Sequence, residues 1–157
     1  MANSISPLQA GDAAPDFSVL DQNGRERTLA EFRGKKVILF FYPKDNTPGC
    51  TKQACNLNDH WGTLQKEGYV VLGVSKDPAK SHLKFIEKFG LQFDLLCDED
   101  LALHHSYGVW GLKKFQGREY DGTHRTTFVI DGEGILERII AKPRVKEHAE
   151  EILAPAD

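Results

Sequence analysis

The sequence predicts an α/β domain in which a mixed β-sheet carries helices on both faces. Strand-like and helix-like segments alternate through the first half of the chain, which favours parallel strands joined by helical crossovers. A hairpin pattern then precedes a final helical segment and adds antiparallel strands to the sheet. The length of 157 residues is typical of one domain. We therefore expect a single domain over residues 1–157, with residues 1–10 as a flexible N-terminal extension.

The first half of the chain supplies two buried strands and the helix that joins them. Residues 36–42 and 69–75 are largely apolar and β-prone, which is typical of strands buried on both faces. Between them, residues 48–66 repeat apolar side chains at steps of four and three, which predicts an amphipathic helix. Those side chains are Cys50, Ala54, Leu57, Trp61 and Leu64. The crossover is long enough for the two strands to lie parallel.

Shorter patterns define the remaining elements. Residues 16–20 alternate like a strand and run into a hairpin turn at residues 21–24. Asp77 and Pro78 predict the start of a helix, and Gly90 predicts its end. The other expected elements are a helix over 101–107, an irregular segment over 108–123, a hairpin of 124–130 with 135–141, and a closing helix over 145–153.

Composition and charge argue against several classes of protein. The chain has 20 Lys and Arg residues against 23 Asp and Glu, a net charge of −3, whereas binders of nucleic acids or anionic membranes carry basic patches. Its apolar runs fall far short of the ~20 residues of a membrane helix, and the N-terminus has no signal-peptide pattern. The odd number of three cysteines suits reduced thiols. We therefore expect a cytoplasmic protein without membrane or nucleic-acid partners.

Cys50 has the position of a reactive thiol. It would be the third residue of the helix over 48–66, after Thr47 as N-cap and Pro48 as first helical residue. The free N–H groups and the positive dipole end of a first helical turn favour a thiolate, which is the nucleophilic form of cysteine. The alternative is a buried structural cysteine on the apolar stripe.

Cys55 lies five residues after Cys50 on the same expected helix. In an ideal helix this places it about 140° further round and about 7.5 Å further along the axis. The two Cα atoms would then be roughly 8–9 Å apart, beyond the ~7 Å limit for a disulfide. A disulfide between them requires the first helical turns to unwind, which would make the pair a redox switch coupled to local unfolding.

The segment from residue 41 to 55, FYPKDNTPGCTKQAC, resembles the active-site loop and helix of peroxiredoxins, and is most similar to the Q-type or bacterioferritin-comigratory subfamily. The family pattern of Pro, three residues, Thr, two residues and Cys falls on Pro43, Thr47 and Cys50. Residues 73–77 and 125–128 also resemble this subfamily, and the likeness runs from about Gly11 to the final helix.

The resemblance implies a thioredoxin-like fold with a peroxiredoxin-type N-terminal hairpin and an atypical 2-Cys thiol peroxidase without metal or organic cofactor. Cys50 would reduce hydrogen peroxide and organic hydroperoxides and become a sulfenic acid. Cys55 would resolve it into a Cys50–Cys55 disulfide, which thioredoxin or a similar dithiol would reduce. The resemblance also implies a monomer that protects the cell against oxidative stress.

The same resemblance assigns supporting roles at the site. The Arg125 guanidinium, the Thr47 hydroxyl and the backbone N–H groups of Gly49 and Cys50 would stabilise charge on the departing oxygen. Pro43 would shield the sulfur from water. Taken alone, Thr47 could be only an N-cap, Pro43 only a strand terminator, and Arg125 only a surface residue paired with a carboxylate.

Other candidates have simpler interpretations. Cys97 ends an apolar run and is interpreted as a buried bystander, with a role as alternative resolving thiol left open. The adjacent His104 and His105 do not share a helix face and make a poor metal pair.

Two other functions use the same residues. A general thiol–disulfide oxidoreductase usually has two residues between its cysteines, whereas four separate Cys50 from Cys55. A zinc module using these cysteines and His60 lacks the paired short spacings of structural zinc sites.

Overall fold

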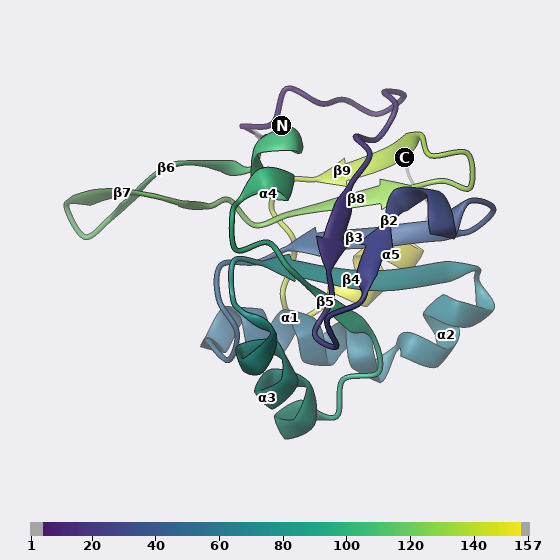
Figure 1. Cartoon of the computed structure of the whole chain (residues 1–157), viewed down its shortest axis with the longest axis horizontal. Coiled ribbons are helices and arrows are strands. Elements are labelled where there is room, and N and C mark those ends of the chain that lie inside the picture. Colours follow the sequence, from purple (N-terminus) through teal and green to yellow (C-terminus); the bar gives the residue numbers. More distant parts are fainter. Residues whose placement is uncertain (1–4, 155–157) are drawn as a thin grey trace.

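The structure, a computed structural model, describes residues 5–154 and has a central five-stranded sheet in the order β5-β4-β3-β8-β9 (Figure 1). The strands are β1 (Ser18–Leu20), β2 (Glu26–Thr28), β3 (Lys36–Phe41), β4 (Tyr69–Ser75), β5 (Asp94–Cys97), β6 (Trp110–Phe115), β7 (Arg118–Thr123), β8 (Thr126–Ile130) and β9 (Leu136–Ile140). The helices are the 3-10 helix η1 (Leu29–Phe32), α1 (Pro48–Asp59), α2 (Trp61–Lys66), α3 (Ala79–Phe89), α4 (Ala102–Ser106) and α5 (His148–Leu153). β3, β4 and β5 run parallel, and β8 and β9 add antiparallel pairs, so the predicted mixed sheet is confirmed.

β3 is the centre of the molecule, and its side chains alternate between two apolar clusters. Val37, Leu39 and Phe41 belong to a cluster that includes residues of η1 and α4. Ile38 and Phe40 belong to the other cluster, which includes residues of α1, α2, α3 and α5. Each face of the sheet is therefore covered by helices, as predicted, because a strand buried on both faces needs an apolar layer on each side (Figure 1).

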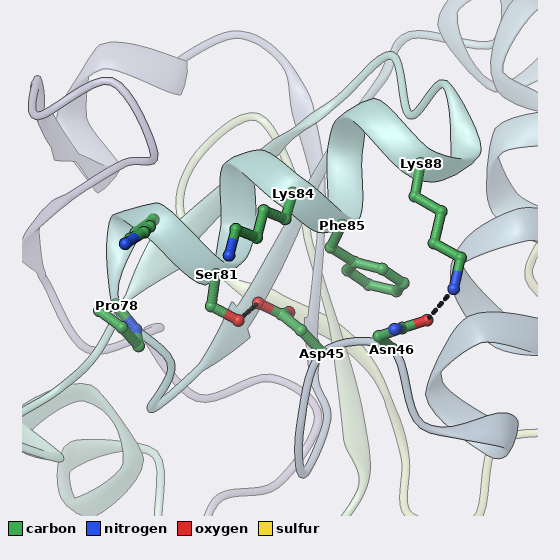
Figure 2. A pocket seen from close by; sticks show the side chains of 8 residues that line it. Asp45, Asn46, Pro78, Ser81, Lys84, Phe85 and Lys88 are labelled. Carbon is green, nitrogen blue, oxygen red and sulfur yellow. Dashed lines mark hydrogen bonds between the residues drawn. The ribbon is translucent and has the colours of Figure 1, made fainter.

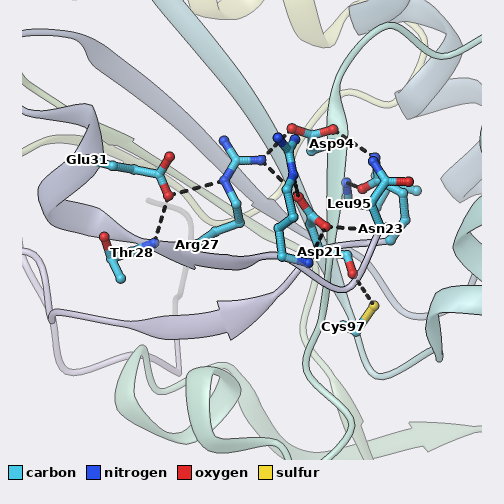
Figure 3. Close-up of polar contacts among 10 residues, drawn as sticks. Asp21, Asn23, Arg27, Thr28, Glu31, Asp94, Leu95 and Cys97 are labelled. Carbon is cyan, nitrogen blue, oxygen red and sulfur yellow. Dashed lines mark hydrogen bonds and ion pairs between the residues drawn. The ribbon is translucent and has the colours of Figure 1, made fainter.

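The predicted N-terminal hairpin is present as β1 and β2, and polar contacts attach it to the sheet edge (Figure 3). The buried Asp21 carboxylate accepts hydrogen bonds from the N–H groups of Asn23 and Arg25 across the turn. The Arg27 guanidinium pairs with Asp21 and with Asp94 of β5. Further back, residues 5–10 lie against the domain, since Ser6 Oγ donates to the Tyr107 carbonyl over 2.6 Å. The rest of the predicted extension, residues 1–4, lies outside the described residues.

The helix predicted over 48–66 is in fact two helices, which meet at His60. The His60 ring Nδ1 donates to the Asn56 carbonyl over 2.9 Å, while its backbone N–H reaches that oxygen only at 3.3 Å. With φ −105° and ψ 11°, His60 leaves helical geometry and separates α1 from α2. The prediction of one continuous helix is therefore wrong.

The irregular segment predicted over 108–123 is also wrong, because these residues form the β6–β7 hairpin. Gln116 and Gly117 at its tip both have positive φ, 50° and 77°, as a tight hairpin turn requires. The hairpin projects from the domain (Figure 1), and Leu112 and Phe115 on it are exposed. Of the two strands only Gly122 and Thr123 are buried, and a hairpin with so little buried surface does not need alternating apolar and polar residues, so its sequence carries no strand period.

Within residues 5–154, no helix has the length and apolar character needed to cross a bilayer.

Candidate active site

Cys50 lies at the start of α1, directly beyond the carboxyl end of the central strand β3. Pro48 occupies the first helical position and Cys50 the third, as the sequence predicts. The Cys50 side chain is 1% exposed and packs in the same apolar cluster as Ala54 and Leu57. The thiol therefore sits at the end of α1 where backbone N–H groups lack helical partners and the dipole is positive.

Arg125 brings a guanidinium to this sulfur from across the sheet. It directly precedes β8, which pairs with β3, so the two chain segments end side by side. Arg125 Nη2 lies 3.3 Å from Cys50 Sγ, and Nη1 donates to Gln53 Oε1 over 2.7 Å. A Cβ atom at Gly49 would lie 3.2 Å from Arg125 Nη2, so a larger residue at this position would crowd the guanidinium.

Gln53 is a site residue that the sequence analysis missed. It is fully buried, lies one helical turn after Cys50 on the same face of α1, and accepts the hydrogen bond that holds Arg125. Among the buried side-chain nitrogen and oxygen atoms of residues 5–154, its Nε2 alone has no partner. The sequence feature that could have indicated Gln53 is its polar side chain three positions after Cys50, on the face of the helix that is otherwise directed at the core.

Thr47 is the N-cap residue by position, with extended φ and ψ of −93° and 156°. Its side chain makes no cap hydrogen bond within the described chain, and the hydroxyl instead donates to the Lys44 carbonyl over 2.8 Å. The predicted N-cap position of Thr47 is therefore confirmed, while its hydroxyl group closes the loop before α1. Pro43, at the start of this loop, is half-buried.

Cys55 is a half-buried free thiol on α1, and Cys50 is free as well. Burial, and to a lesser extent the Asp59 carboxylate, raise the pKa of Cys55 above its usual value. The residue after Cys55 fastens α1 to α5. Asn56 Nδ2 donates to the Lys146 carbonyl and to Glu150 Oε1, and its Oδ1 accepts from the Ala149 N–H over 2.7 Å.

Comparison with known proteins identifies this arrangement. Residues 10–139 match the model of the AhpC/TSA family. The chain belongs to the AhpC/TSA family. Peroxiredoxin Bcp of Escherichia coli is 45% identical over 149 residues, covering 95% of this chain and 96% of that protein. The predicted membership of the Q-type or bacterioferritin-comigratory peroxiredoxins, and with it the prediction of a thiol peroxidase, is confirmed.

Solved structures confirm the thioredoxin-like fold of this peroxiredoxin. Peroxiredoxin Q of Xanthomonas campestris is 34% identical, with a TM-score of 0.84 over 96% of this chain and 95% of that one. The bacterioferritin comigratory protein of the same organism, whose structures bear on its alkyl peroxide reduction activity, is 33% identical, with a TM-score of 0.82 over 98% and 95% of the two chains.

A cavity of about 240 Å³ lies beside Arg125 in this peroxiredoxin. Its lining combines apolar and cationic side chains: Ile5, Lys113, His124, Arg125, Thr126, Ala141, Lys142 and Pro143. Lys113 reaches it from β6 and donates to the Thr123 carbonyl over 2.9 Å. Burial and the charge of Arg125 lower the pKa of Lys113, and the negative charge of a Cys50 thiolate opposes this shift.

The remaining candidates lie elsewhere in the peroxiredoxin fold. Cys97 ends β5, and its Sγ donates to the Asp21 carbonyl over 3.6 Å, a contact with the N-terminal hairpin (Figure 3). His104 is buried between Asp98 and Thr123, whereas His105 is exposed. In the part of the chain that the structure describes, no cluster of three metal-binding side chains includes Cys50, Cys55 or His60.

Proposed function

We propose that this peroxiredoxin reduces hydrogen peroxide and organic hydroperoxides with Cys50 as the nucleophile. The observation that carries the proposal is the Arg125 guanidinium, which contacts Cys50 Sγ at 3.3 Å and is held in place by the buried Gln53. A fixed positive charge beside the sulfur attracts the negative charge that develops on the peroxide as its O–O bond breaks.

In the first step the Cys50 thiolate attacks the distal oxygen of the hydroperoxide. The S–O bond forms as the O–O bond breaks, the electron pair leaves with the other oxygen, and that oxygen takes up a proton to become water or an alcohol. The Thr47 hydroxyl donates its hydrogen bond to the Lys44 backbone carbonyl. The hydroxyl oxygen of Thr47 is therefore available to accept a hydrogen bond from the incoming hydroperoxide. Pro43, which has no N–H, limits the access of water.

In the second step Cys55 attacks the sulfenic sulfur, a disulfide forms and water leaves. The α-helix holds the two cysteines apart, so the first turns of α1 must unwind before this bond can form. Burial raises the pKa of Cys55 while the helix is folded, and unwinding removes that burial. The motion that brings Cys55 to Cys50 therefore also lowers the pKa of its thiol toward the ordinary value.

The proposal also covers the substrate class, the reductant, the oligomeric state and the cellular compartment. The apolar part of the cavity beside Arg125 suits the alkyl group of an organic hydroperoxide, and the activity described for the X. campestris relative supports this substrate class. Thioredoxin or a similar dithiol protein would reduce the disulfide by exchange. We further propose a monomeric, single-domain enzyme. The small, odd number of three cysteines favours a reducing compartment such as the cytoplasm.

Single turnovers of two variants test this sequence of steps. Cys50→Ser is expected to consume no peroxide. Cys55→Ser is expected to consume one equivalent rapidly and to stop at the sulfenic acid, which mass spectrometry detects as one added oxygen. Continued turnover of Cys55→Ser with thioredoxin, together with loss of turnover in Cys97→Ser, would contradict the assignment of Cys55.

A further inference from the structure

Several hydrogen bonds attach the loop between β3 and α1 to the domain: Lys88 Nζ donates to Asn46 Oδ1 over 3.3 Å, and a larger cluster surrounds the buried carboxylate of Asp45. The backbone N–H of Asp45 donates to Asp77 Oδ2 over 2.8 Å. Its Oδ1 accepts from the Tyr42 hydroxyl, and its Oδ2 accepts from Ser81 Oγ over 2.8 Å and from His82 Nδ1 over 2.7 Å. Figure 2 shows Asp45 and Asn46 turned toward α3, at the edge of a cavity of about 640 Å³.

His82 is the strongest of these partners because it is a buried cation. Its side chain is fully buried, and its Nε2 lies 2.9 Å from the Leu96 carbonyl. A carbonyl and a carboxylate can only accept hydrogen bonds, so both ring nitrogens carry protons. Burial opposes the charge, but the Asp45 carboxylate, with contacts to Cys97 and Leu96, raises the pKa of His82 to about 10.

The same side chains place ligand atoms of Asp45, Asp77 and His82 within 4.8 Å of one another. Proton donors already occupy the facing oxygens, since Asp77 Oδ2 accepts from Ser75 Oγ and from the Asp45 N–H. This is the pattern of a hydrogen-bonded anchor. The neighbouring Asn46 has a φ of 60°, in the left-handed region that asparagine adopts more readily than most residues other than glycine.

We propose that His82 is a positioning residue of the peroxidase reaction, which fixes the loop of residues 43–47 through Asp45 and thereby keeps the first turn of α1 folded. The inference rests on the function proposed above. Asp45 lies two residues from Pro43 and two from Thr47, so the anchor sets where both stand relative to Cys50. His82 itself contacts neither Cys50 nor its substrate and acts only through the carboxylate.

The two chemical steps place opposite demands on this anchor. Attack on the peroxide needs the loop and the first turn of α1 folded, whereas disulfide formation needs that turn unwound. Loss of the anchor is therefore expected to slow peroxide attack by about tenfold, since small displacements of reacting groups cost this much or more. It is expected to accelerate the conversion of sulfenic acid to disulfide, because the unwound state becomes more populated.

Three variants separate positioning from a general loss of stability. His82→Phe keeps a ring but removes both N–H donors. His82→Asn places an amide nitrogen where Nδ1 stood and keeps a neutral hydrogen bond to Asp45. His104→Phe is the matched control, because His104 is a second buried histidine whose Nδ1 lies 2.6 Å from a carboxylate, that of Asp98.

The experiment mixes each reduced full-length variant rapidly with hydrogen peroxide and follows sulfenic acid formation and disulfide formation separately. His82→Phe is expected to slow the first rate about tenfold and raise the second, and His82→Asn is expected to recover most of the first rate. His104→Phe is expected to lower the melting temperature and leave both rates near the wild-type values. Equal effects of the two Phe variants, or no recovery in His82→Asn, would overturn the proposal.

Misfolding of His82→Phe and failure of the proposed peroxidase function can each be distinguished from failure of this proposal. If His82→Phe does not fold, Asp45→Asn makes the same test, since it weakens the bond to His82 and is expected to produce the same opposite changes in the two rates; unchanged rates in Asp45→Asn would overturn the proposal. Failure of the proposed function has a different signature, namely wild-type protein whose Cys50 is not oxidised by peroxide.

Discussion

Replacement of Arg125 by lysine tests the geometry of the site rather than its charge. The guanidinium uses two nitrogens on two partners, with Nη1 on Gln53 Oε1 at 2.7 Å and Nη2 on Cys50 Sγ at 3.3 Å. A lysine ammonium keeps the positive charge but is a single point on a flexible stem. In Arg125→Lys it can bind Gln53 or the sulfur, and it cannot present a planar pair of donors to both.

The expected loss follows from the role of the donor at the developing negative charge. Removing one such preorganised donor typically costs about 10²–10³ in rate. We expect Arg125→Lys to lose about 10²-fold in the second-order rate constant of Cys50 with hydrogen peroxide, or about 2.7 kcal/mol of transition-state stabilisation.

The assay is a stopped-flow single turnover of the reduced enzyme with peroxide in excess. Arg138→Lys is the matched control, because Arg138 also uses both terminal nitrogens, on the carbonyls of Ile152 and Glu151, away from Cys50. We expect the control to react at the wild-type rate. An Arg125→Lys enzyme as fast as Arg138→Lys would refute the argument that the bidentate guanidinium drives the reaction.

Three further outcomes are expected. Gln53→Met should slow peroxide attack about tenfold, because it removes the acceptor that holds Arg125. It should leave the melting temperature nearly unchanged, because it also removes a buried donor that has no partner. A fall in the melting temperature alongside the slower reaction would contradict this. Asn56→Ala loses three side-chain hydrogen bonds to the start of α5 and should reduce unfolding free energy by about 2 kcal/mol while accelerating disulfide formation. Asn58→Ala, on the same helix, should leave disulfide formation unchanged. Burial opposes the charge of His82, but Asp45 raises its pKa in the folded protein from 6.5 to about 10; Asp77 and Cys97 are its other titratable neighbours. The protonated His82 therefore stabilises the folded state fully below pH 6.5, and this contribution to the free energy of unfolding is lost as the pH rises to about 10. Urea titrations should therefore show the stability difference between wild type and His82→Asn narrowing across that interval, and a constant difference would argue against the charge.

Sequence patterns within a segment predicted the secondary structure of that segment. β3, β4 and the start of α1 follow from apolar runs, proline and helix periodicity, and these elements alone place Cys50 at a helix N-terminus. Arg125 was different, because no local pattern connects it to Cys50, 75 residues earlier. Only the family resemblance predicted their association, and antiparallel pairing of β3 with β8 is the physical reason for it.

Contacts between distant segments account for what the sequence did not reveal. Asp77 reads as a helix cap, but α3 starts only at Ala79 and the carboxylate accepts the N–H of Asp45 instead. His82 is likewise 37 residues from its carboxylate partner. β5 is four residues long, too short for a clear period, and was missed for that reason.

A non-reducing tryptic map after one equivalent of hydrogen peroxide tests most directly whether Cys50 is the peroxide-reactive thiol and Cys55 its disulfide partner. Trypsin cleaves after Lys52, which separates Cys50 in residues 45–52 from Cys55 in residues 53–66, and Cys97 falls in residues 89–113. We expect peptides 45–52 and 53–66 to be joined by a disulfide and Cys97 to stay a free thiol. A reduced Cys50, or a disulfide that joins residues 45–52 to 89–113, would contradict this expectation.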